Sequence, residues 1–156
     1  MSQLTADLFA VNLRKVLKTH GHLPAFERSL ANPNQDFAVE LERPPLHTLN
    51  IEVLPPVTNR FRVPAVAVAH TWISHGDLMR DPEIVFAVKP EGWVPYEITQ
   101  DPVGCYRNAF DADGHFDENI SRDLLPLTKA WARNLVVQGW TGESEDHSIK
   151  PKLQSL

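Results

Sequence analysis

Five side chains that could take part in chemistry fall close together between residues 70 and 83. Imidazole and carboxylate groups are the donors that zinc and manganese bind, so this stretch could supply ligands for a divalent metal. The spacing follows no zinc-site pattern, and we expect no cofactor and no resident metal. A metal-dependent hydrolase or nuclease remains the alternative function, with His70, His75, Asp77 and Asp81 as its ligands. The five side chains are His70, His75, Asp77, Asp81 and Glu83.

His70 belongs to an apolar run that covers residues 65–73. In an extended strand it shares a face with Val68 and Trp72, because successive side chains point to opposite sides. A histidine in such a place is typically a hydrogen-bonded interior or half-buried residue. We therefore predict a structural role for His70.

The nine residues that follow, 74–82, read Ser-His-Gly-Asp-Leu-Met-Arg-Asp-Pro and are expected to form a charged loop between two strands. Arg80 can pair with Asp81 or with Glu83, which would stiffen the loop and present Met79 and Arg80 outward. Methionine and arginine are both enriched at protein interfaces. We predict a protein-binding site made of His75, Asp77, Met79, Arg80, Asp81 and Glu83; pure scaffolding is the alternative.

A second acidic stretch, residues 111–118, partly resembles a calcium-binding loop. Its glycine stands at the fourth position instead of the sixth, and no glutamate occupies the twelfth. Asp113-Gly114 instead favours a hairpin turn. The four tryptophans can be core residues or an exposed aromatic patch, and the sequence does not choose between the two.

Composition excludes several classes of protein. A net charge of −5 and a pI near 5.8 argue against direct nucleic-acid binding, which normally needs a basic surface. The single cysteine, Cys105, cannot form an internal disulfide, and no apolar run reaches the roughly 18 residues that span a bilayer. The first residues do not follow the pattern of a secretion signal. We therefore expect a cytoplasmic protein without a membrane partner.

Periodicity predicts the elements that hold these residues in place. Apolar residues at helical spacing predict helices over residues 5–20 and 124–138, with a short helix beginning near Pro24. Alternating or continuously apolar runs predict strands at 37–41, 48–54, 63–73, 83–89, 93–98 and 105–110. Pro126 should sit in the first turn of its helix, and Gly139 should end that helix with Trp140 folded back on it.

These elements predict one α+β domain over residues 1–140 and a flexible tail over residues 141–156. Its antiparallel sheet of four to six strands should carry the N-terminal and C-terminal helices on one face. The other face, or its rim near residues 74–83, is then the candidate functional surface. The strand at residues 37–41 could lie at an edge and join two copies in a homodimer.

Two motifs resemble a known family. Residues 76–83 read Gly-Asp-Leu-Met-Arg-Asp-Pro-Glu, and residues 131–140 read Trp-Ala-Arg-Asn-Leu-Val-Val-Gln-Gly-Trp. Together with residues 96–104 they resemble an uncharacterised family of small proteins encoded by bacterial plasmids, integrative elements and phages. The resemblance implies a mobile genetic element and assigns no catalytic residue. We therefore expect a non-enzymatic accessory protein that binds another protein, for example a component of a host defence system.

Overall fold

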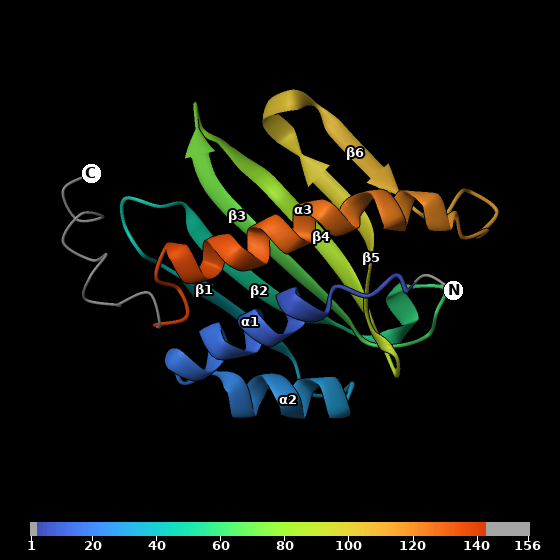
Figure 1. The fold of residues 1–156 in the computed structure, drawn as a ribbon, viewed down its shortest axis with the longest axis horizontal. Helices are drawn as coiled ribbons and strands as arrows, with labels where there is room; N and C mark the ends of the chain where they lie inside the picture. The colour runs from blue at the N-terminus through green and yellow to red at the C-terminus, as the bar shows by residue number, and fades with distance from the viewer. Residues whose placement is uncertain (1–2, 143–156) are drawn as a thin grey trace.

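A computed structural model describes residues 3–142 as three helices and six strands, joined in part by short 3₁₀ turns (Figure 1). Two helices come first, four strands follow, a hairpin is added, and a long helix ends the described chain. The elements are α1 (Asp7–Thr19), α2 (Leu23–Ala31), β1 (Phe37–Leu41), β2 (Thr48–Leu54), η1 (Pro56–Thr58), β3 (Ala65–Ser74), β4 (Asp77–Lys89), β5 (Gly92–Gln100), η2 (Asp101–Val103), β6 (Cys105–Asn108) and α3 (Glu118–Val137).

The six strands form one antiparallel sheet in the order β1-β2-β3-β4-β5-β6, so each strand pairs with its neighbours in the sequence. The predicted α+β class and its antiparallel sheet are confirmed. β1 lies at one edge, as predicted for residues 37–41, and β6 at the other. β3 and β4 are the longest central strands and share the most extensive pairing, from Ala65↔Ala87 to Ser74↔Asp77.

All three helices lie on one face of the sheet, with α3 crossing the strands and α1 and α2 beside it (Figure 1). This helix-side face is apolar because alternate strand residues point toward it. Phe9 of α1 stacks on Phe86 of β4 at 4.8 Å and touches Trp131 of α3 at 4.9 Å. The Asn12 side-chain amide donates a hydrogen bond of 2.9 Å to the carbonyl of Ala132, which ties α1 to α3. The terminal helices therefore pack on one face, as predicted.

α3 differs from its prediction at the start and agrees at the end. It begins at Glu118 because the Asp117 carboxylate caps it by accepting a hydrogen bond from the Asn119 backbone, so Pro126 lies inside the helix. At the other end Gly139 adopts a φ of 86°, a conformation that glycine tolerates best. The Trp140 amide then bonds to the Leu135 carbonyl at 2.9 Å, and the indole is fully buried. The predicted glycine cap is confirmed.

The opposite face of the sheet, which we call the open face, carries no helix across its centre within residues 3–142. One end of it is covered by the segments 55–64 and 109–117, where Phe61 packs against Phe110 and Phe116 at 4.9 and 5.0 Å. The remainder, toward the β3–β4 turn, is uncovered.

Two further predictions concern the chain as a whole. No helix within residues 3–142 combines the length and apolarity needed to cross a bilayer. The tail predicted for residues 141–156 lies outside the described residues except for its first two. Of these, Thr141 is buried at 4% exposure, and its carbonyl accepts a 2.7 Å bond from the Thr19 hydroxyl. The folded part therefore reaches slightly past residue 140.

Candidate functional site: the β3–β4 arm

The segment predicted as a charged loop, residues 74–82, is almost entirely strand. β3 continues to Ser74 and β4 begins at Asp77, so only His75 and Gly76 form the turn. Both have positive φ angles, 52° and 84°, as a two-residue hairpin turn of the primed type requires. The prediction of a loop was wrong because its polar composition hid the strand pattern.

These two strands extend beyond their neighbours. β2 pairs with β3 only as far as Thr71, and β5 pairs with β4 only from Glu83 onward. Residues 72–82, which we call the arm, therefore form a two-stranded ribbon whose turn points past the edge of α3 (Figure 1). A ribbon of this kind exposes both of its faces.

A bulge at the base of the arm decides which side chains meet. Ala69 pairs with Glu83 and Thr71 with Arg80, so the residues between Arg80 and Glu83 form an irregularity in β4. Residues three apart in a regular strand point to opposite faces, but here Arg80 reaches the Glu83 carboxylate at 3.4 Å. The predicted pairing of Arg80 with Glu83 is confirmed.

Arg80 also makes a contact that its local sequence did not predict. Its Nε lies 3.0 Å from the Asp101 carboxylate, and its backbone amide donates to the same oxygen at 2.9 Å. Asp101 is in the 3₁₀ turn after β5, so these bonds fasten the arm to the β5–β6 hairpin. The hydrogen bond to Arg80 holds the pKa of Asp101 below its usual range and raises that of Arg80.

The six residues predicted to bind a partner do not form one surface. By the strand register, Arg80 and Glu83 face the open side, whereas Asp77 and Met79 face the helix side. His75 is exposed in the turn, and Asp81 accepts a 3.2 Å bond from the Gln100 side chain.

The arm carries an apolar pair that sequence reasoning missed. Ile73 and Leu78 are directly paired across the two strands on the open side, at 67% and 60% exposure. On the other side of the ribbon, Met79 pairs with Trp72, whose ring stacks on His47 at 4.1 Å. The sequence did offer a signal for this pair: Ile73 and Leu78 stand at equal distances from the His75-Gly76 turn, where a hairpin pairs them.

His70 has the structural role predicted for it. The Trp131 indole donates a hydrogen bond of 2.9 Å to its Nε2, which links β3 to α3. Burial lowers the pKa of His70, because desolvation disfavours the charged imidazole. His70 is therefore a neutral link in the interface between the sheet and the helices.

The alternative metal site is not assembled by this fold. His70 and His75 lie on the same extended strand and its turn, roughly 16 Å apart at about 3.3 Å per residue. Within residues 3–142, the side chains found close enough for a shared ion are those of Asp111, Asp113 and His115. The set His70, His75, Asp77 and Asp81 is not among them.

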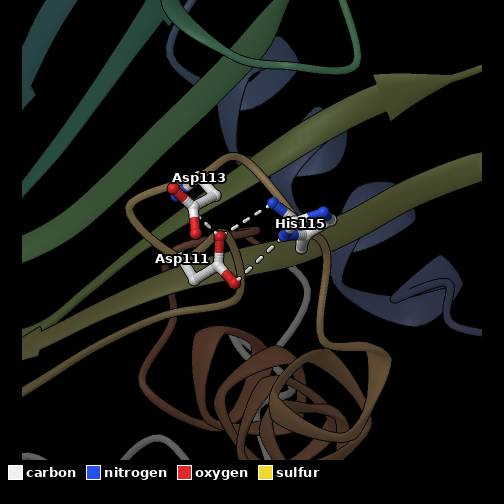
Figure 2. Close-up of side chains that lie close together, drawn as sticks. All are labelled: Asp111, Asp113 and His115. Atoms are coloured by element: carbon white, nitrogen blue, oxygen red, sulfur yellow. Dashed lines mark hydrogen bonds and ion pairs between the residues drawn. The ribbon is translucent and has the colours of Figure 1, made fainter.

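Asp111, Asp113 and His115 gather in an exposed loop after β6, with ligand atoms within 4.8 Å of one another (Figure 2). One Asp111 oxygen already accepts the backbone amides of Asp113 and His115, both at 2.9 Å. The bond from the His115 amide is the main reason that the pKa of Asp111 is lowered. The carboxylate thus stabilises the turn that the Asp-Gly sequence predicted.

Comparison with known proteins gives a family without an activity. The family model described as a domain of unknown function, DUF6908, matches residues 13–141. The chain belongs to the DUF6908 family. No curated protein and no solved structure is significantly similar to it. The family match includes the whole arm and both of the motifs noted above, and it brings no site residues with it.

Proposed function

We propose that this DUF6908 protein binds another protein through the arm, as a non-enzymatic accessory factor of a mobile genetic element. The observation that carries the proposal is the Ile73–Leu78 pair, two large apolar side chains that stand exposed on a projecting ribbon. Exposed apolar groups gathered at one place on a polar rim are typical of interaction sites.

The way the arm is held supports the same proposal. Binding costs less when the interacting segment is already ordered, and the bonds from Arg80 to Asp101 and Glu83 order the base of the arm. The mobile-element setting rests on the resemblance of residues 76–83 and 131–140 to plasmid and phage proteins. A host defence component is the partner that this setting favours.

The proposal can be tested with one matched pair of variants. Leu78→Ser removes half of the apolar pair, and Val57→Ser removes a side chain that is 76% exposed on η1, away from the arm. Tagged wild type and both variants are used to capture proteins from a host lysate, and each captured protein is quantified. A partner of the arm is retained by wild type and Val57→Ser and lost from Leu78→Ser. If Leu78→Ser retains every captured protein, the arm is not the binding site.

A further inference from the structure

Two rows of side chains cross the open face between the arm and the covered end of the sheet. The strand register brings together residues from all six strands in each row. One row is Glu40, Asn50, Ala69, Glu83, Thr99 and Tyr106; the next is Ala38, Glu52, Ala67, Val85, Glu97 and Asn108. Each row therefore carries two glutamates, one on each side of the alanines of β3.

The charges on this surface are mainly negative. Arg80 is the cation of the arm on this side, and it is already bonded to Asp101 and Glu83. Among the described residues, no ion pair includes Glu40, Glu52 or Glu97. Glu97 does accept a 2.7 Å hydrogen bond from the Tyr106 hydroxyl, which leaves its charge in place.

A second cation on this face lies at its far end. Lys89 sits 4.3 Å from the Phe61 ring centroid, and its ammonium pairs with Glu91 at 3.2 Å. It is thus held among the segments that cover that end of the sheet. The uncovered part keeps a net negative charge.

We call the two rows together the strip. The carboxylates in the middle of the strip repel one another. Glu83 is half-buried, and burial is the main cause of its raised pKa. The charges of Glu97 and Glu52 raise that pKa further, while Arg80 lowers it. A cation placed over the strip would relieve this repulsion, since opposite charges favour the ionised form.

The centre of the strip is made of small buried side chains. Ala67 and Ala69 are only 8% and 3% exposed, so the surface that a partner meets is formed by the flanking glutamates, of which Glu52 is exposed and Glu83 and Glu97 are half-buried. Tyr106, at 59% exposure, stands at one side, and Ile73 and Leu78 continue the surface along the arm. The face thus joins an apolar part to an acidic part.

We infer that the open face receives a basic segment of the same partner protein, with lysine or arginine side chains set over Glu52, Glu83 and Glu97. This inference rests on the proposed function, because the arm supplies the apolar half of the surface. Charge complementarity is what selects the occupant: a polyanion such as nucleic acid or an acidic membrane would be repelled.

The spacing of the strip suggests the probe. Glu52 and Glu97 are three strands apart in one row, about 14 Å at the usual strand separation, and residues four apart in an extended peptide span a similar length. The probe is a labelled peptide with arginine at every fourth position and threonine elsewhere. A second peptide with glutamine in place of each arginine is its neutral match.

Binding of both peptides to the full chain is measured by fluorescence anisotropy. The double variant E52Q/E97Q keeps one acceptor oxygen at each position and removes two charges from the strip. The double variant D36N/D113N removes two charges from exposed positions outside it and gives the same net charge. We expect wild type to prefer the arginine peptide by about tenfold, E52Q/E97Q to lose most of that preference, and D36N/D113N to stay within about twofold of wild type.

Equal losses in the two double variants would show that overall charge alone attracts the peptide, and the inference would be wrong. It would also be wrong if wild type bound the two peptides equally. Neither result touches the proposed function, because capture that depends on Leu78 is measured without the peptides. The opposite combination is also informative. If wild type prefers the arginine peptide but Leu78→Ser captures every partner normally, the arm is not the binding site and the acidic strip still binds basic segments.

Discussion

The two faces of this sheet are built from the same strands and have opposite properties. In β2, Leu49 and Ile51 are fully buried against the helices, whereas Asn50 and Glu52 between them face the open side. In β3, valines face the helices and alanines face outward. Alternation along a strand thus separates two sets of residues. One set packs against the helices; the other packs under the segments 55–64 and 109–117 at one end and carries polar and charged residues toward the arm.

This comparison teaches where substitutions should matter. On the helix side a lost side chain leaves a cavity in a closed core, which costs stability. At exposed positions of the open side and the arm, such as Glu52 and Leu78, the same loss changes the surface that a partner would meet and leaves packing intact. The following predictions test that division.

The largest effect is expected for Phe86→Ala on the helix side. Phe86 is fully buried, stacks on Phe9 with ring centroids 4.8 Å apart, and packs at a tilt against Trp93 with centroids 5.8 Å apart. Its removal should lower the free energy of unfolding by about 3–5 kcal/mol, because a large aromatic core residue is lost. Urea unfolding followed by tryptophan fluorescence measures this. A loss under about 1 kcal/mol would contradict a closed helix-side core.

The next effect concerns the polar link within that core. Trp131→Phe keeps an aromatic ring of smaller size and removes the indole N–H that donates to His70, so it should lower the free energy of unfolding by about 1–3 kcal/mol at neutral pH. The matched change Trp93→Phe alters a buried tryptophan that makes no contact with His70. Trp93→Phe should lower the free energy of unfolding by less than Trp131→Phe, because it removes no hydrogen bond to His70.

His70 also predicts how stability depends on pH. Burial lowers its folded-state pKa below the ordinary 6.5, so the unfolded chain takes up a proton first as the pH falls. Its contribution should be complete above the ordinary pKa and decline below it. Unfolding measured at about pH 7.5 and about pH 5.5 should differ more for wild type than for His70→Gln, which stays neutral. If wild type and His70→Gln lost the same stability between the two pH values, another group than His70 would cause the pH dependence.

A local effect is expected where the arm meets the sheet. Asp101→Ala removes both the partner of the Arg80 guanidinium and the acceptor of its backbone amide. Amide hydrogens of residues 77–81 should then exchange about tenfold faster, because the arm opens without global unfolding. The amide of Ile84, in the centre of the sheet, serves as the control. Equal acceleration at both places would mean that Asp101 stabilises the whole domain.

The smallest effect on stability is expected for Leu78→Ser. This side chain is 60% exposed and contacts no closed core, so the free energy of unfolding should change by no more than about 0.5 kcal/mol. Thermal unfolding with Leu135→Ser as the buried comparison measures the contrast. A large loss would show that the arm contributes to the core.

The sequence predicted most of the fold because burial leaves a periodic pattern. The strand at residues 48–54 and the central run at 65–73 were placed correctly, since one or both of their faces are covered. Gly139 and Trp140 marked the end of α3 through the chemistry of the cap. In contrast, Asp117 was overlooked as the cap that starts α3, so the helix was expected to begin too late.

The arm could not be predicted in the same way. Beyond β2 and β5 none of its residues is fully buried, so Asp77, Arg80 and Asp81 give it the composition of a loop. The contact between Arg80 and Asp101 joins residues 21 positions apart, and the contact between Arg80 and Glu83 depends on the bulge in β4. Neither the bulge nor Asp101 has a periodic signal, whereas the split of the predicted binding residues between two faces follows from the alternation of side chains along β4.

The order of the strands has a consequence for how the chain is made. Every strand pairs with the strand just before or after it, so the sheet can form step by step as residues emerge from the ribosome. α1 is different, because its contact with α3 joins Asn12 to Ala132 across 120 residues. The first helix synthesised can meet β4 through Phe9 and Phe86 as soon as that strand has formed, but its contact with α3 is made only after the whole sheet has been synthesised.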